Sequence, residues 1–290
     1  MDLASFKAIW QPKLNEQLSH NLKATVKNAQ LHEVMDYAVM NGGKRLRPLL
    51  TLAVIESFGR SPERYLTEAS ALELIHAYSL IHDDLPAMDD DDMRRGKPTT
   101  HVKFGQAMAI LAGDALQPLA YEWINESLVL SDFQKSQLTL GLTKASGPNG
   151  MVGGQVLDMA FTGHDDATLF DAENVHRLKT GALIRYALVA GGILVDANQV
   201  TLSALDDFGS AFGFAFQIND DLDDLSQDDQ EDKQAYPTLL GVQGAQDALA
   251  EQVALARDAL AIVRYNSHAN VELLESFLEY FKPALEKQWV

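Results

Sequence analysis

Two clusters of aspartate residues are the part of this sequence best suited to chemistry. The first is HDDLPAMDDDDMRRG at residues 82–96, where six carboxylates fall within ten positions, and the second is FQINDDLDD at residues 216–224. Neighbouring like charges repel one another, so two such clusters, each ending an apolar helical stretch, indicate a bound cation. Mg²⁺ prefers carboxylate oxygens, and water and substrate phosphate complete its shell. The clusters therefore predict a site for Mg²⁺ and a phosphorylated substrate.

The second cluster has the spacing of a helix face. Asp220 and Asp224 are four residues apart, so on a helix they lie one above the other. Gln217 and Asp221 share a nearby face. Helix bundles present carboxylates to a central cavity in this way. Two facing helices that each end in aspartates would bring both clusters to one cavity.

The first cluster is less regular. Its candidate ligands are Asp83, Asp84 and Asp89. Because Asp83 and Asp89 are six positions apart, they would lie about 120° apart around an ideal helix. Pro86 removes a helical hydrogen bond and is expected to distort the segment, so a local bulge could realign them. Asp90 would align with Asp83 on a straight helix, so spacing alone does not choose the ligand. An acidic, solvated surface stays an alternative, whereas the ligand spacing of an EF-hand is absent.

Positive charge is scarce in this chain, and it occurs in a few distinct places, some of them just after the acidic clusters. There are 23 Lys and Arg residues against 41 Asp and Glu, for a net charge of −18. Glycines let backbone amides approach an anion, and Arg suits bidentate contacts with phosphate. The candidates for contacts with phosphate oxygens are Lys44, Arg45 and Arg47 of GGKRLRP, His76, Arg94, Arg95, Lys179 and Lys233. A diphosphate bridged by Mg²⁺ would satisfy both the carboxylates and these cations.

Helical periodicity extends along almost the whole chain. The stretch LTEASALELIHAYSLIHDDL, for example, carries a broad apolar face. Alternating stretches bounded by turn residues are missing, so strands are not expected. No break is long or biased enough to be a linker between domains. We expect one all-α domain over residues 1–290, a large helical bundle of roughly ten or more helices.

The composition excludes several classes of protein. An acidic chain with a pI of about 4.7 repels nucleic acid and anionic membranes. The absence of cysteine excludes disulfides and thiolate metal sites. The longest apolar stretch, 187–195, contains two glycines and is too short to span a membrane. The N-terminal residues lack the apolar centre of a secretory signal, so we expect a soluble, cytoplasmic protein.

Several motifs in order give the chain a family resemblance. They are GGKRLRP, HAYSLIHDDLPAMDDDDMRRG, LAGDAL, GGQVLDM, KTGALIRYA and FQINDDLDD, between residues 25 and 245. Together they resemble the short-chain trans-isoprenyl diphosphate synthases, and most closely the bacterial farnesyl class. The resemblance implies an all-α bundle around a deep central cavity, a homodimer, and about three Mg²⁺ ions per active site.

The same resemblance implies roles for individual residues. The metal ligands would be Asp83, Asp84 and Asp89 in the first cluster and Asp220, Asp221 and Asp224 in the second. The allylic diphosphate would be held by Arg94, Lys179, Thr180, Gln217 and Lys233, and isopentenyl diphosphate by Lys44, Arg47, His76 and Arg95. Lys179, Gln217, Asp83 and Asp220 would take part in catalysis.

The expected reaction is the addition of isopentenyl diphosphate to dimethylallyl and then geranyl diphosphate, which gives farnesyl diphosphate. Tyr78 lies five residues before Asp83, about 7.5 Å deeper along a helix, and its ring could stop the growing chain. Ser79 leaves room that a geranyl-only enzyme would fill. The alternatives are a geranylgeranyl diphosphate synthase and a non-catalytic partner subunit, although such a subunit would usually lose one aspartate cluster.

Two segments depart from the family pattern. The loop SQDDQEDKQAYP lacks the usual Gly-Lys-Ser/Thr before its Tyr-Pro, and the C-terminus ALEKQWV lacks the arginine-rich ending. A class I terpene cyclase is excluded, because the second metal site of that class would need Ser or Thr at Asp223 and Glu at Gln227.

Overall fold

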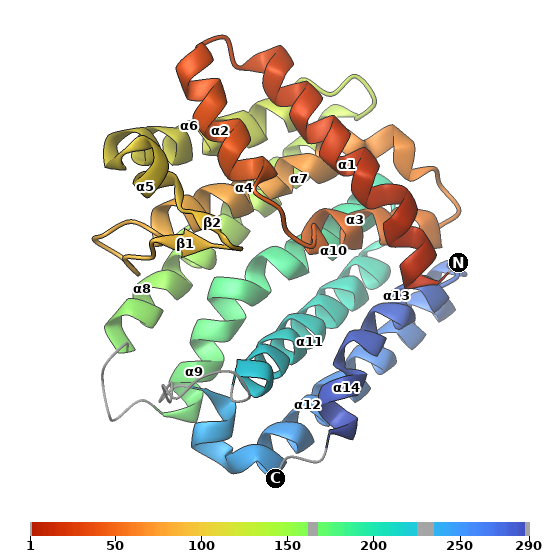
Figure 1. The fold of residues 1–290 in the computed structure, drawn as a ribbon. Helices are drawn as coiled ribbons and strands as arrows, with labels where there is room; N and C mark the ends of the chain where they lie inside the picture. Colours follow the sequence, from red (N-terminus) through yellow and green to blue (C-terminus); the bar gives the residue numbers. More distant parts are fainter. Residues whose placement is uncertain (1, 162–167, 225–234, 288–290) are drawn as a thin grey trace. The chain divides into compact units, whose positions relative to one another are not determined.

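The computed structural model describes residues 2–161, 168–224 and 235–287, and helices make up most of them (Figure 1). The prediction of an all-α fold is confirmed. Within the same residues, no helix is both long and apolar enough to cross a membrane. The chain divides into two compact units, so the prediction of a single domain stays a prediction, and each unit is described by itself.

The N-terminal unit comprises Ala4–Leu52 and Ser61–Thr139. Its elements are α1 (Leu3–Thr25), α2 (Ala29–Met40), the start of α3 (Leu46–Ser57), η1 (Pro62–Tyr65), α4 (Leu66–Asp83), β1 (Met93–Arg94), β2 (Lys97–Pro98), α5 (Thr100–Phe104), α6 (Gln106–Asn125) and the start of α7 (Asp132–Ser146). Helix α4 is buried on most sides and lies beside α6 (Figure 1). A Cβ at Gly113 of α6 would lie 2.1 Å from Nε2 of His82, so the absence of a side chain at Gly113 makes room for the imidazole of His82.

The C-terminal unit consists mainly of residues 140–290. Its further elements are α8 (Met151–Phe161), α9 (Leu169–Val175), the π-helix η2 (His176–Gly181), α10 (Ala182–Leu194), α11 (Gln199–Asp224), α12 (Tyr236–Ser267), α13 (Glu272–Ser276), η3 (Phe277–Phe281) and α14 (Lys282–Glu286). Helices α10, α11 and α12 lie side by side (Figure 1). A Cβ at Gly209 of α11 would lie 2.7 Å from Cα of Arg185, so this helix pair packs backbone to backbone.

The expectation of no strands is wrong in one place, because β1 and β2 form a small antiparallel hairpin. Its two-residue turn is Arg95-Gly96, and both residues have positive φ, 53° and 75°. That is the backbone of a type I′ turn, the connection that matches the twist of paired strands. Strands of two residues are too short to show alternation, and Arg is an unusual residue for the left-handed region. The turn therefore escapes detection from sequence, although it positions two of the predicted site residues.

Candidate active site

The first aspartate cluster begins where helix α4 ends. The amide of Asp89 donates a hydrogen bond to the carbonyl of Asp83 at 2.9 Å, and the amides of Met88 and Asp90 donate to the carbonyl of Leu85. The chain after α4 thus folds back on itself, and the backbones of Asp83 and Asp89 meet although they are six positions apart in the sequence. This tight loop takes the place of the bulge expected at Pro86. It brings two of the predicted ligands together at the helix end.

The third member of that cluster, Asp84, is engaged by an arginine. Its Oδ1 accepts from Nε of Arg94 at 2.6 Å and lies 2.5 Å from Nη2. Asp84 is 3% exposed, and this burial raises the pKa of its carboxyl while the hydrogen bond from Arg94 opposes the rise. The contact fixes the guanidinium of Arg94 beside the first cluster. A metal-ligand role for Asp84 stays a prediction.

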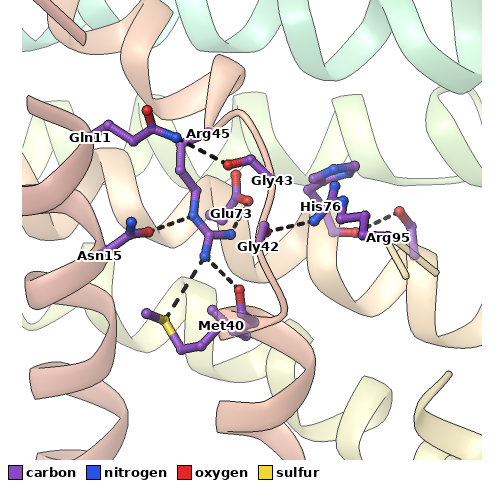
Figure 2. Close-up of polar contacts among 11 residues, drawn as sticks. Gln11, Asn15, Met40, Gly42, Gly43, Arg45, Glu73, His76 and Arg95 are labelled. Carbon is purple, nitrogen blue, oxygen red and sulfur yellow. Dashed lines mark hydrogen bonds and ion pairs between the residues drawn. The ribbon is translucent and has the colours of Figure 1, made fainter. Parts of the chain in front are cut away.

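The glycines of GGKRLRP form a sharp bend before α3. Gly42 and Gly43 have φ of 95° and 117°, which is a conformation that favours glycine. Nη1 of Arg95 donates to the carbonyl of Gly42 at 2.7 Å, and a Cβ at Gly43 would lie 2.6 Å from the same nitrogen (Figure 2). Gly43 is therefore favoured by its positive φ, and the guanidinium of Arg95 packs against it. The contact joins this loop to the turn that follows the first aspartate cluster.

Arg45 is buried under the same loop and holds it in place. Its Nη1 forms an ion pair with Glu73 at 2.7 Å, Nε donates to Asn15 at 2.8 Å, and Nη2 donates to the carbonyl of Val39 at 2.7 Å (Figure 2). Because Arg45 is 4% exposed and its donors are occupied, it supports the loop and is poorly placed to bind a substrate. Its neighbours differ, since Lys44 is exposed and Arg47 is half-buried. The sequence showed Arg45 in the basic motif but gave no sign of its partner 28 residues away.

His76 lies within the electrostatic reach of four arginines. Burial lowers the pKa of His76 well below its usual 6.5, and the positive charges of Arg47, Arg95, Arg45 and Arg94 lower it further. The imidazole is therefore neutral at pH 7 and can donate one hydrogen bond without adding charge. A cluster of cations around a neutral donor is an arrangement that a phosphate group would neutralise. The N-terminal unit thus brings together most of the residues predicted to bind isopentenyl diphosphate.

Tyr78 and Ser79 lie on α4 between His76 and the first cluster. Tyr78 is 5% exposed and packs edge-on against His82, with ring centroids 5.9 Å apart. Burial raises the pKa of its hydroxyl to about 12, so it stays protonated. The hydroxyl of Ser79 donates to the carbonyl of His76 at 2.9 Å and is satisfied within the helix. Their role in limiting product length stays a prediction.

The second cluster forms the last turns of α11. Asp220 and Asp224 are one helical turn apart, as their spacing predicted. Oδ2 of Asp221 accepts a hydrogen bond from the amide of Tyr236 at 2.9 Å, and Asn219 donates to Asp223 at 3.0 Å. No three acidic or histidine side chains of the described residues are grouped closely enough to hold a metal. Carboxylate pairs still fit Mg²⁺, which usually takes one or two carboxylates and completes its shell with water and substrate phosphate.

Lys179 and Thr180 lie on the π-helix η2, which interrupts the apolar run there. Nζ of Lys179 forms an ion pair with Asp158 of α8 at 2.5 Å. A Cβ at Gly154 would lie 2.2 Å from the amide nitrogen of Lys179, so the glycine lets α8 reach η2. Asp158 was not singled out from the sequence, although it lies in the GGQVLDM motif. Irregular π turns are frequent at functional sites, which agrees with the predicted role of this segment.

The predicted residues thus fall into two groups. The N-terminal unit holds Asp83, Asp84, Asp89, Lys44, Arg47, His76, Arg94 and Arg95, and the C-terminal unit holds Lys179, Thr180, Gln217, Asp220, Asp221 and Asp224. Lys233 lies outside the described residues. The meeting of both groups across a deep cavity stays a prediction.

Comparisons with known proteins identify the family of this chain. A family model described as polyprenyl synthetase matches residues 28–271. Farnesyl diphosphate synthase of Geobacillus stearothermophilus is 41% identical over 264 residues, which cover 84% of this chain and 89% of that protein. A chloroplastic geranylgeranyl pyrophosphate synthase of Capsicum annuum is 40% identical over 233 residues, covering 76% of this chain and 63% of that protein. The crystal structure of an FPP/GFPP synthase from Zymomonas mobilis, in its apo form, matches with a TM-score of 0.85 and 36% identity, and covers 96% of this chain and 98% of that one.

Proposed function

This chain belongs to the polyprenyl synthetase family, and from that premise we propose that it condenses isopentenyl diphosphate with dimethylallyl and then geranyl diphosphate to give farnesyl diphosphate. Members of the family are enzymes, and the chain is a trans-prenyltransferase most similar to farnesyl diphosphate synthases. The observation that best supports the substrate assignment is the loop after α4. There the backbone of Asp89 folds back onto Asp83 while Asp84 holds Arg94, so residues predicted to bind metal lie beside a cation predicted to bind diphosphate.

Isopentenyl diphosphate would bind at the basic cluster of the N-terminal unit. Lys44, Arg47 and Arg95 supply positive charge, and neutral His76 donates a hydrogen bond to the same diphosphate. The buried Arg45, next to Lys44 in the chain, ties the glycine loop to Glu73 and to the carbonyl of Val39. Arginines held by carbonyl and carboxylate partners lose little freedom on binding, which favours affinity.

The allylic diphosphate would be held by cations of both units, namely Arg94, Lys179 and Lys233, with Thr180 and Gln217. Their positive charges would stabilise the negative charge that grows on the leaving diphosphate as the allylic carbon–oxygen bond breaks. The π-electrons of isopentenyl diphosphate then form the new carbon–carbon bond, and a proton leaves the resulting cation to the released diphosphate. Gln217 could stabilise the cation, and no protein nucleophile takes part.

Mg²⁺ would be held by Asp83 and Asp89, with Asp84 in the same motif, and by Asp220, Asp221 and Asp224; three ions per site are implied by the resemblance. When bound, such ions act as Lewis acids toward the leaving diphosphate. The chain's own part is to present carboxylate oxygens in pairs, through the loop after α4 and through the last turns of α11.

Product sizing tests the proposal directly. The protein would be incubated with Mg²⁺, isopentenyl diphosphate and either dimethylallyl or geranyl diphosphate, and the products dephosphorylated and separated by chromatography. Fifteen-carbon product from both starters supports the proposal, twenty-carbon product identifies a geranylgeranyl diphosphate synthase, and no product indicates a non-catalytic partner subunit. A homodimer and a cytoplasmic location are further parts of the proposal, and the mass of the protein in solution tests the first.

A further inference from the structure

Tyr236 makes polar contacts in two directions at the start of α12. Its amide donates to Oδ2 of Asp221 in the second aspartate cluster at 2.9 Å. Its hydroxyl donates to Oε1 of Glu173 on α9 at 3.3 Å. The side chain is 1% exposed, and burial, together with the negative charge of Glu173, raises the pKa of the hydroxyl far above its usual 10.

The ring of Tyr236 is also held on two sides. It stacks on His176, with centroids 5.7 Å apart and planes 26° apart, and it meets Phe214 edge-on at 5.5 Å. His176 and Phe214 are themselves in edge contact at 6.4 Å, so the three rings form one cluster. Aromatic pairs of this geometry add stability beyond the burial of their area.

The three rings come from three elements of the C-terminal unit. His176 begins the π-helix that carries Lys179 and Thr180, and Phe214 lies two turns before Asp221 on α11. Tyr236 begins α12 and is the residue whose amide reaches back to the aspartate cluster. An ordinary core aromatic would fill space, but this one ties the end of α11 to the segment that bears the predicted diphosphate lysine.

We propose that Tyr236 is a positioning residue that clasps the second aspartate cluster to the π-helix, and thereby sets the distance between Asp221 and the residues that hold the allylic diphosphate. This rests on the proposed function for the identity of the ligand. The clasp consists of the Tyr236 amide on Asp221, the hydroxyl on Glu173, and the ring between His176 and Phe214.

A matched pair of variants separates the amide from the ring. Tyr236→Ala and Tyr236→Pro both remove the ring, but only the proline variant also removes the donor to Asp221. Proline is tolerated at the first position of a helix, and ψ of Ala235 is 141°, as proline requires of the residue before it. We expect Tyr236→Ala to weaken the binding of inorganic diphosphate with Mg²⁺ about tenfold, and Tyr236→Pro to weaken it at least another threefold, by analogy with outer-shell partners of metal ligands. Isothermal titration calorimetry, which needs no turnover, measures both.

A second set of variants keeps the fold intact. Tyr236→Phe and Glu173→Gln each alter the hydroxyl contact, and because they act on one hydrogen bond their combined effect should be smaller than the product of the two. Each should raise KM for the allylic substrate about two- to threefold and leave KM for isopentenyl diphosphate unchanged. Tyr186→Phe, which alters another buried tyrosine of the same unit, is the control and should change neither constant.

The proposal is wrong if Tyr236→Ala and Tyr236→Pro bind diphosphate and Mg²⁺ with the same affinity. It is also wrong if Tyr236→Phe or Glu173→Gln raises KM for the allylic substrate and KM for isopentenyl diphosphate by the same factor. These outcomes are separate from failure of the proposed function. A wild-type protein that binds Mg²⁺ and diphosphate but forms no prenyl product would overturn the proposed reaction, whereas the comparison of the binding variants would still test the clasp.

Discussion

The first aspartate cluster lies in a loop that folds back on itself, and the second lies on a continuous helix. At the first, the positions of the carboxylates depend on two contacts: the hydrogen bond from the amide of Asp89 to the carbonyl of Asp83, and the contact of Arg94 with Asp84. At the second, Asp220 and Asp224 are aligned by helical geometry alone. The first cluster therefore depends on contacts made by the loop, while the second depends on what holds the end of α11.

This difference has a physical consequence for how each cluster is supported. The first is supported by charge, because Arg94 forms an ion pair with the buried Asp84 of the cluster. The second is supported by the backbone and rings of the clasp. Substitutions at the two clusters should consequently have different effects. The predictions below are given from the largest expected effect to the smallest.

The largest effect is expected from a change at the first cluster itself. Asp83→Asn removes a carboxylate charge from the position where the loop closes, and we expect kcat/KM to fall about 100- to 1,000-fold, as when a single transition-state contact is lost. Asp90→Asn is the matched control, because Asp90 is exposed and lies in the same loop. Steady-state assays of both variants check this, and equal losses in the two would show that the cluster acts only through its total charge.

The next effect separates a buried ion pair from an exposed one. Glu73→Ala leaves Arg45 as an uncompensated buried charge, so the free energy of unfolding should fall by about 3 kcal/mol or more. Asp206→Ala breaks the half-exposed pair with Arg185 in the other unit and should cost less than about 1 kcal/mol. Urea denaturation measures both. Similar losses at the two sites would show that the pair under the glycine loop is no more important than a surface contact.

A third prediction uses the residue that precedes each cluster by five positions. That residue is Tyr78 before Asp83 but Ala215 before Asp220, and both are buried. If Tyr78 closes the product cavity, Tyr78→Ala should raise the ratio of twenty- to fifteen-carbon product about tenfold, which corresponds to about 1.4 kcal/mol. Chromatography of the products decides this. A Tyr78→Ala variant that is folded and active but still makes only fifteen-carbon product would show that Tyr78 does not close the product cavity.

The same comparison shows which parts of the site the sequence could predict. The alignment of Asp220 with Asp224 follows from a period of 3.6 residues, and α11 has that geometry. The fold-back of Asp89 onto Asp83 could not be predicted from spacing, because it depends on three hydrogen bonds that backbone amides donate in a short loop. The type I′ turn has Arg95 at its first position, and Arg rarely adopts positive φ, so residue preferences did not predict this turn.

Partners that are distant in sequence were also beyond prediction. Glu73 is 28 residues from Arg45, and Asp158 is 21 residues from Lys179. In each case a cation was identified from its residue type and its motif, but the carboxylate that holds it depends on how helices pack. Residue type and motif therefore single out these cations but give no information about which carboxylates hold them.

The smallest effect concerns His76 and is visible only as a change with pH. A histidine whose pKa is lower in the folded protein binds protons more weakly when folded, so its contribution to stability is present above about pH 6.5 and is lost as the pH falls below that value. Relative to His76→Gln, the wild type should lose up to about 1.4 kcal/mol of unfolding free energy per pH unit below 6.5. Other titrating groups are common to both proteins and cancel in the difference. Urea denaturation of both between pH 8 and pH 5 measures this loss, and a constant difference over that range would show that burial and the surrounding arginines do not lower the pKa of His76.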